Sequence, residues 1–239
     1  PDGDHDAWAR EWKATGDRMM ALAEDALAAG DPVSAREAYY RASNYYRVIQ
    51  YPLYGYPVDP RLVDAFEAET TAFLKGAALS DFPIEPVEIP FEGTTLPGYL
   101  VLVDDSGAPR PTIVHTNGYD SDIQEMFFAH AIAAVRRGYN ILLFDGPGQG
   151  RNLIIDNMHM RPAWETVVTP VIARLSESRS ARSPWTNSGA AYHGVAISDC
   201  STALTSRAMP KSASTADPTG GSSSDNPVFG MAGFPELRP

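Results

Sequence analysis

Two turns carry the residues best suited to chemistry, and the first of them is Asn117-Gly-Tyr-Asp-Ser121. It follows a short apolar run and opens a predicted helix, so its N–H groups lie near the positive end of the helix dipole. Gly118 permits the tight turn, and N–H groups placed in this way can stabilise a developing oxyanion. The alternative, which spacing alone favours, is a plain strand-to-helix turn with Asp120 or Ser121 as the helix cap.

The second turn is Phe144-Asp-Gly-Pro-Gly-Gln-Gly150. Its glycines resemble a phosphate cradle, but Pro147 removes a donor, no Lys-Ser/Thr follows, and the dinucleotide-binding spacing is absent. We therefore expect a turn by which the chain leaves a sheet. Among the nearby polar residues, His115 is expected to be a hydrogen-bonded core histidine, and Asp122 and Glu125 to be solvated helix residues.

Helices are predicted throughout residues 1–80, which form the first of three segments. The first helix ends at Gly30, and a second begins at Asp31-Pro32, where Asp is the N-cap and Pro takes the first helical position. Asp59-Pro60 repeats that signal for a third helix, which ends at Gly76. A single helix pair of this kind cannot bury its apolar faces alone, so it needs a partner surface.

Strands and helices alternate in the second segment, residues 81–175, which predicts an α/β fold. Two runs, Val87–Phe91 and Gly98–Val103, read as an antiparallel hairpin joined by Glu92–Thr95. Thr112–Thr116, a helix that stops at Gly138, and Tyr139–Phe144 form a βαβ unit, so Val114 and Leu142 should lie on neighbouring strands. A further helix is predicted from Trp164 to about Leu175. The third segment, residues 176–239, is rich in Ser, Gly and Pro, and we assign no regular structure to residues 210–239.

Several motifs in the same order resemble one branch of the α/β-hydrolases, the branch of 2,6-dihydroxypseudooxynicotine hydrolases, fungal pigment polyketide-shortening hydrolases and fermentation-respiration-switch esterases. The motifs that carry the resemblance are Phe91-Glu-Gly-Thr-Thr-Leu-Pro-Gly-Tyr99, Asn117-Gly-Tyr-Asp120, Phe144-Asp-Gly-Pro-Gly-Gln-Gly150, Trp164-Glu-Thr-Val-Val-Thr-Pro170, Ala35-Arg-Glu-Ala-Tyr39 and Ala42-Ser-Asn-Tyr-Tyr46. The resemblance covers roughly residues 8–175. It implies that residues 1–80 are a helical cap and residues 81–175 the N-terminal half of a hydrolase core.

The resemblance also implies a chemistry. Members cleave esters, or carbon–carbon bonds next to ketones, with Ser, Asp and His and without a metal or cofactor. The first turn would then supply an oxyanion donor, the N–H of Tyr119 beside Gly118. If the cap closes over the site, the rings of Tyr45 and Tyr46, together with Glu165, would line a pocket for a small aromatic or polyketide-like substrate. The alternative for the two tyrosines is packing within the cap.

The sequence departs from this family at the nucleophile. The Gly-x-Ser-x-Gly motif of the strand-to-helix elbow does not occur. The nearest candidate is Gly194-Val-Ala-Ile-Ser198, which puts Ala196 at the nucleophile position and the N–H of Ile197 at the oxyanion, with Ser198 as a displaced nucleophile. No histidine follows His193, so residues 176–239 read as a degenerate elbow region and tail. Two alternatives to a hydrolase stay open: a ligand-binding protein without turnover, and a helical-repeat adaptor.

Composition narrows the class of protein. A formal net charge of −11 and a pI near 4.8 disfavour a nucleic-acid or anionic-membrane surface. The single cysteine, Cys200, cannot form an internal disulfide, and no zinc-type Cys/His spacing occurs. We expect a cytoplasmic protein whose partner is a small-molecule substrate, with no cofactor and no metal; a homodimer is compatible with these observations.

Overall fold

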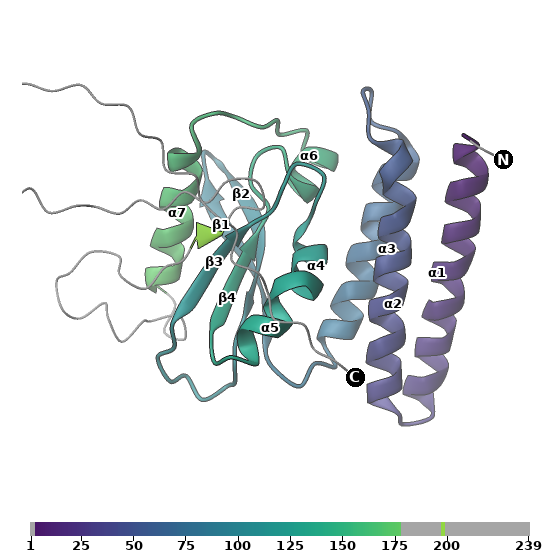
Figure 1. The fold of residues 1–239 in the computed structure, drawn as a ribbon, viewed down its shortest axis with the longest axis horizontal. Coiled ribbons are helices and arrows are strands. Elements are labelled where there is room, and N and C mark those ends of the chain that lie inside the picture. The colour runs from purple at the N-terminus through teal and green to yellow at the C-terminus, as the bar shows by residue number, and fades with distance from the viewer. Residues whose placement is uncertain (1–2, 178–196, 199–239) are drawn as a thin grey trace, which may run out of the picture. The chain divides into compact units, whose positions relative to one another are not determined.

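The computed structural model describes residues 3–177 and 197–198. Three long helices come first: α1 (His5–Ala28), α2 (Pro32–Gln50) and α3 (Pro60–Ala77), with α2 packed between α1 and α3 (Figure 1). We call them the helical cap. The predicted starts are confirmed, because Asp31 accepts a hydrogen bond from the Ser34 N–H at 3.1 Å and Asp59 from the Arg61 N–H at 2.9 Å.

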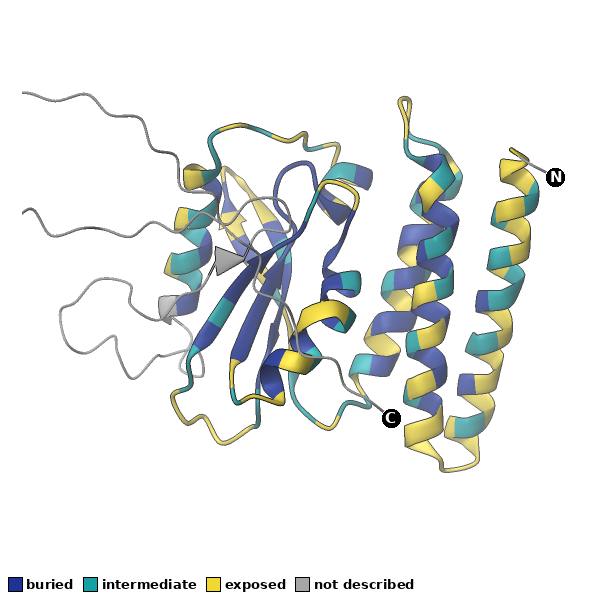
Figure 2. Ribbon diagram, viewed as in Figure 1, coloured by how far each residue is buried: buried dark blue, intermediate teal, exposed yellow. Residues whose placement is uncertain are grey.

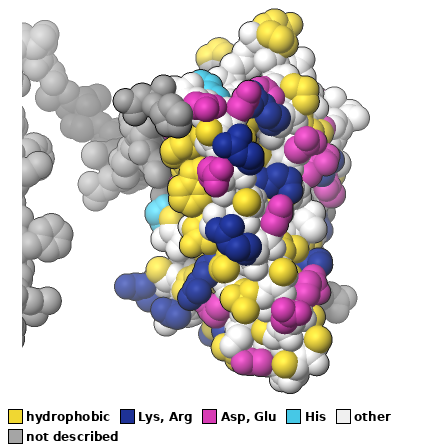
Figure 3. Space-filling view, turned by 90° about the vertical axis from the view of Figure 1, so that its right-hand side faces the viewer, with side chains coloured by type: hydrophobic (Ala, Val, Ile, Leu, Met, Phe, Trp, Pro, Cys, Tyr) yellow, Lys and Arg dark blue, Asp and Glu magenta, His cyan; other side chains and the backbone are white. Residues whose placement is uncertain are grey.

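The outer surface of the cap has the mixed charge of a solvated helical face. Lys and Arg alternate there with Asp and Glu (Figure 3), and two ion pairs among the described residues join α3 to α1. Lys75 of α3 bonds Glu24 of α1, and Arg61 bonds Asp6. Exposed pairs of this kind contribute little to stability, so the cap depends mainly on its apolar contacts.

The sheet has the strand order β1-β2-β4-β3-β5. Its strands are β1 (Ile84–Phe91), β2 (Thr94–Val101), β3 (Thr112–Thr116), β4 (Asn140–Phe144) and β5 (Ile197–Ser198). The first two form the predicted antiparallel hairpin, and β2 is also antiparallel to β4. Strand β3 pairs in parallel with β4, with Val114 opposite Leu142 as predicted, and with β5 on its other side.

The structure differs from the sequence prediction at the hairpin turn. The predicted connection was Glu92–Thr95, but the turn has only two residues, because Glu92 and Gly93 both adopt positive φ, at 45° and 83°. Two consecutive positive φ angles are those of a type I′ turn, whose twist matches the flanking strands. Strand β2 therefore begins at Thr94, closer to the turn than the predicted Gly98, whereas β1 ends at Phe91 as predicted.

Helices on both sides of the sheet bury it. The helix after β3 consists of α4 (Ile123–Met126), a π-helical turn (Phe127–Ala131, η2) and α5 (Ile132–Val135), where a plain helix was expected. Helix α6 (Gly150–Ile154) was not predicted, and α7 (Trp164–Glu177) matches its prediction. Every residue of β4 is buried (Figure 2), as expected of a strand covered on both faces.

The cap finds its partner surface on one face of this sheet. Phe73 of α3 is fully buried, with its ring centre 4.9 Å from that of Tyr99 on β2 and 5.1 Å from that of Phe127. On the other face, α7 packs Val167, Val171 and Leu175 over the sheet. The apolar side of α3 is thus part of the sheet core.

Gly98 supplies a test of the strand packing. A Cβ atom at this position would lie 2.6 Å from the Leu143 carbonyl oxygen of β4, and backbone cannot yield there without breaking the sheet. We expect Gly98→Ala to lower the free energy of unfolding by about 2 kcal/mol, measured by urea denaturation. Gly55→Ala is the matched control, because nothing lies within 4 Å of its Cβ position and its φ is not positive. Equal stability of the two variants would contradict this packing.

Candidate active site

A buried polar cluster lies where β3 and β4 end. Asn117 follows β3 and Asp145 follows β4, and the carboxyl ends of parallel neighbours meet at one edge of a sheet. The Asn117 amide donates to Asp145 Oδ1 at 2.6 Å, and both side chains are buried. This contact joins the two turns that the sequence singled out.

Gln149 binds the two turns together a second time. Its Oε1 accepts from the Gly146 N–H at 2.9 Å and from the Thr116 hydroxyl at 3.2 Å, and its amide donates to the Asn117 carbonyl. Asn152 adds a bond from its amide to the Asp145 carbonyl at 2.7 Å. The backbone of both turns is therefore fixed by buried side chains.

The glycines of the second turn make room for this cluster. Gly150 has φ +39°, and a Cβ there would lie 2.2 Å from the Asp145 carboxylate. Gly146 packs on the Trp164 ring, and a Cβ atom at this position would lie 2.5 Å from the nearest ring atom. The motif thus lets the chain leave the sheet, as the sequence predicted, while it encloses Asp145.

Burial sets the protonation of Asp145. Desolvation raises the pKa of this carboxyl, the nearby charge of Asp122 adds to the rise, and the hydrogen bond from Asn117 opposes it, so that the pKa lies at about 7. A carboxyl with a pKa in this range can take up or release a proton near neutral pH. Such groups concentrate at functional sites, although structural networks also produce them.

The cap contributes Arg47 to the same edge of the sheet. Its Nη1 donates to Asp122 Oδ2 at 2.6 Å, and its Nη2 donates to the Asp120 carbonyl at 3.0 Å and to Glu125. The expectation that Asp122 and Glu125 are solvated was wrong for Asp122, which is fully buried, and Glu125 is only partly exposed. The sequence did not reveal the reason, because the partner lies 75 residues away in another segment.

Arg47 itself was missed by the sequence analysis. It lies on α2 with Ser43 and Gln50, which share its face of the helix at steps of three and four residues and are also buried. The sequence signal for this contact was a row of polar residues at helical spacing, next to the apolar face of the predicted helix. Gln50 in turn donates to Glu69 of α3, whose carboxyl is completely buried, so burial raises its pKa well above the usual value.

The predicted oxyanion turn lies at this edge, and its end is held by the cap. Gly118 is half-buried and the Tyr119 side chain is 73% exposed. Within the described part of the chain, no acceptor is recorded for the Tyr119 N–H. Its role as an oxyanion donor stays a prediction.

The other predicted site residues are not gathered at this turn. Tyr46 donates to Asp17 Oδ1 at 2.8 Å and packs on Gly16, and the Tyr45 ring lies 5.7 Å from that of Trp12. Both rings thus face α1, which favours packing within the cap over a substrate pocket. Burial is the physical reason, because these rings fill the interface between the first two helices.

The remaining predictions are placed as follows. Glu165 is exposed in the first turn of α7. Ile197 and Ser198 are described only as backbone of β5, where Ser198 pairs with His115, and Ala196 lies outside the described residues. The nucleophile and the second oxyanion donor therefore stay predictions. His115 is buried as expected, with its ring 4.5 Å from that of His130.

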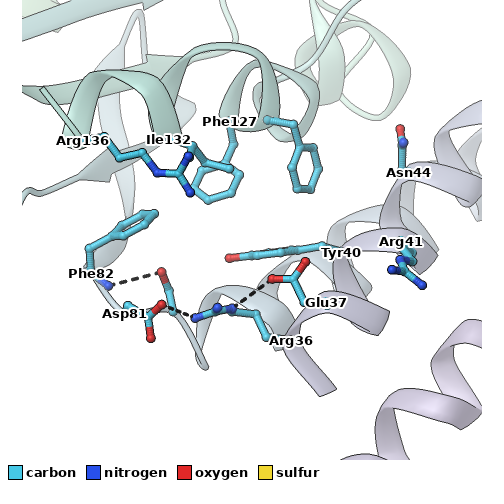
Figure 4. Close-up of a pocket in the computed structure, with 12 residues that line it drawn as sticks. Arg36, Glu37, Tyr40, Arg41, Asn44, Asp81, Phe82, Phe127, Ile132 and Arg136 are labelled. Atoms are coloured by element: carbon cyan, nitrogen blue, oxygen red, sulfur yellow. Dashed lines mark hydrogen bonds and ion pairs between the residues drawn. The ribbon is translucent and has the colours of Figure 1, made fainter. Parts of the chain in front are cut away.

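A cleft of about 420 Å³ opens between the cap and the core, apart from the buried cluster (Figure 4). Phe82 and Phe127 meet Tyr40 across it, and Arg36 pairs there with Asp81 at 2.7 Å. Burial raises the pKa of the Tyr40 phenol to about 12. Within the ranges 3–177 and 197–198, no group of three or more His, Cys, Asp or Glu residues is arranged to hold a metal ion, and no helix is long and apolar enough to span a membrane.

Asp145 makes the stability of the fold depend on pH. Because its pKa is raised, the unfolded chain loses this proton from about pH 4 upward, whereas the folded chain keeps it until about pH 7. The free energy of unfolding should therefore fall between these values and level off above them. Relative to Asp145→Asn, we expect wild type to lose up to about 4 kcal/mol over this range, measured by urea denaturation at successive pH values.

The control for this experiment is Asp105→Asn, which removes an exposed carboxyl. Asp145→Asn will also differ from wild type by a constant offset at all pH values, since an amide oxygen cannot accept both of the bonds that the two carboxylate oxygens accept. The protonation of Asp145 is therefore tested only by the slope of the free energy of unfolding against pH. A parallel pair of curves for wild type and Asp145→Asn would show that this carboxyl ionises normally.

Comparison with known proteins places the chain in a family. A family model described as "Esterase FrsA-like" matches residues 4–153. Hydrolase LUC6 from Fusarium sp is 41% identical over 175 residues, which are 72% of this chain and 42% of that protein. The 20-hydroxy-prefusarin hydrolase FUS2 from Gibberella moniliformis is 40% identical over 179 residues, again 72% of this chain and 42% of its own length.

A solved structure shares the fold. The crystal structure of 2,6-dihydroxy-pseudo-oxynicotine hydrolase superposes with a TM-score of 0.67 and 22% identity, covering 80% of this chain and 50% of that one. The chain thus spans less than half the length of the curated relatives named above. Because the family model covers more than half of the chain, the protein belongs to the FrsA-like esterase family and has part of an α/β-hydrolase fold.

Proposed function

We propose that this chain supplies the cap and the first half of the sheet of a hydrolase that acts on small ketone-bearing, polyketide-like compounds, cleaving esters or carbon–carbon bonds next to a carbonyl. The observation that carries the proposal is the turn after β3. Its Tyr119 N–H has no recorded acceptor among the described residues, while the side chains of Asn117, Ser121 and Asp122 in and beside the turn are buried and hydrogen-bonded. Hydrogen-bond donors that are already held in place stabilise a developing oxyanion best, because no free energy is spent on reorganising them during the reaction.

The proposed chemistry follows from that turn. As a nucleophile attacks the substrate carbonyl carbon, negative charge develops on the carbonyl oxygen, and the Tyr119 N–H donates to it. Asn117 and Gln149 hold the backbone so that this donor need not reorganise. The relatives support the reaction class, since LUC6 and FUS2 are both named hydrolases and the name of FUS2 specifies 20-hydroxy-prefusarin.

Ser198 is the serine to test first as the nucleophile, because β5 pairs it with β3 beside the oxyanion turn. A second candidate function has its own observation: the 239 residues contain no Gly-x-Ser-x-Gly, the motif that places the serine nucleophile in this fold. This favours a protein that binds the same compounds without turnover.

Hydrolysis of an activated aryl ester, p-nitrophenyl acetate, tests the proposal. Tyr119→Pro deletes the backbone N–H and should lower kcat by roughly 100- to 1,000-fold, the usual loss for one oxyanion donor. Tyr119→Ala is the matched control, because it removes the exposed ring but keeps the N–H, and it should retain kcat. Equal losses in the two variants would contradict a role for the N–H.

The same assay separates the two candidate functions. Activity of the chain that disappears in Ser198→Ala assigns the nucleophile. No hydrolysis above the buffer rate, together with a saturable rise in Tm on adding an aryl ketone, would reject turnover and support the binding protein. No hydrolysis and no change in Tm would reject both functions for this chain.

A further inference from the structure

We propose that Arg47 is a positioning residue for the oxyanion turn. Its guanidinium, carried by the cap, holds the segment after Tyr119 in the conformation that presents the Tyr119 N–H to substrate. The inference rests on the proposed function, because it takes this turn as the oxyanion site. It gives the cap a role in the geometry of the reaction, in addition to its packing on the sheet.

Three acceptors of one short segment converge on this guanidinium. Asp120, the residue directly after Tyr119, offers its backbone carbonyl at 3.0 Å from Nη2. Asp122 offers Oδ2 at 2.6 Å from Nη1, and Glu125 offers Oε2 to Nη2. The bond to Asp120 is the decisive one, because an ion pair that only joined cap to core would need no bond to the backbone of the turn.

The acceptors are themselves tied to the start of α4. Asp122 is the N-cap residue, and its Oδ1 accepts from the Glu125 N–H at 2.8 Å. Glu125 also accepts from the Ser121 hydroxyl. A displacement of the guanidinium would therefore be passed to residues 120–125 as a unit, and from there to the adjoining Tyr119 peptide.

Burial makes this contact hard to replace. Arg47 is 4% exposed and Asp122 is 0% exposed, so water cannot solvate either charged group while the fold is intact. The Arg47 Cζ atom also lies 5.3 Å from the centre of the Tyr51 ring, which fixes the plane of the guanidinium from the cap side. Only arginine offers a planar fork of donors that can reach a carbonyl and two carboxylates together.

The first part of the experiment compares Arg47→Gly and Arg47→Lys with wild type in the aryl ester assay. We expect kcat to fall roughly 100-fold in Arg47→Gly with KM changed much less, and to fall by an intermediate factor in Arg47→Lys. Arg41→Gly is the matched control, because Arg41 is an exposed arginine of the same helix and carries the same backbone cost of glycine. It should retain the wild-type kcat.

Chemical rescue distinguishes positioning from folding. Adding roughly 50 mM guanidinium chloride, far below denaturing concentrations, should restore part of kcat in Arg47→Gly and leave Arg41→Gly unchanged. If Arg47→Gly does not fold, Arg47→Lys takes its place, with the kcat-to-KM comparison as the test. The positioning role would be overturned if KM rose by the same factor as kcat fell and guanidinium did not restore the activity of Arg47→Gly.

A readout independent of activity separates this inference from the proposed function. The ¹⁵N relaxation of the Tyr119 amide should show increased motion in Arg47→Lys and wild-type values in Arg41→Gly. Increased motion without any hydrolysis by wild type would reject the proposed function and retain Arg47 as the residue that orders the turn. An unchanged Tyr119 amide in Arg47→Lys would overturn the inference, whatever the activity.

Discussion

The ion pair between Arg47 and Asp122 is the constraint on which the arrangement of cap and core depends. Both groups are buried, so folding removes them from water at a cost in free energy. Their mutual attraction offsets this cost only if the two side chains meet with good geometry. Removal of either partner would leave an uncompensated charge inside the protein. The C-terminal half of α2 is therefore bound to the turn after β3, and the aromatic contact of Phe73 with Tyr99 fixes α3 to the sheet beside it.

Charge is concentrated in this region with little solvent to screen it. Glu69, Asp122 and Asp145 are all completely buried, whereas Arg47 is the one cation that lowers the pKa of the first two. Burial and mutual repulsion therefore raise the pKa values of these carboxyls. The arrangement costs stability at neutral pH, because the unfolded chain ionises these carboxyls more easily than the folded chain does.

The site was only partly predictable. The turn at Asn117–Ser121 and the glycine turn at 144–150 stand out in the sequence, because short apolar strands precede them and glycine permits their backbones. Their contact with each other through Asn117 and Asp145 follows from the parallel pairing that the βαβ pattern predicts. The role of Arg47 does not follow, because a single arginine on an amphipathic helix is ordinarily solvated. The two tyrosines of α2 left two interpretations open for a related reason: aromatic rings suit a ligand and a helix interface equally well.

The sequence alone determined the elements and their order: Asp-Pro at two helix starts, alternation in the hairpin, and an apolar run in β4 are local signals that act over a few residues. It also determined the family, through motifs spread over the first 170 residues. Only the tertiary structure decided which polar side chains are buried and bonded together, because Arg47 and Asp122 are 75 residues apart and each is unremarkable in its own helix. Burial is a property of the packed chain, and the ionisation of Asp145 and the placement of the turn after β3 depend on it.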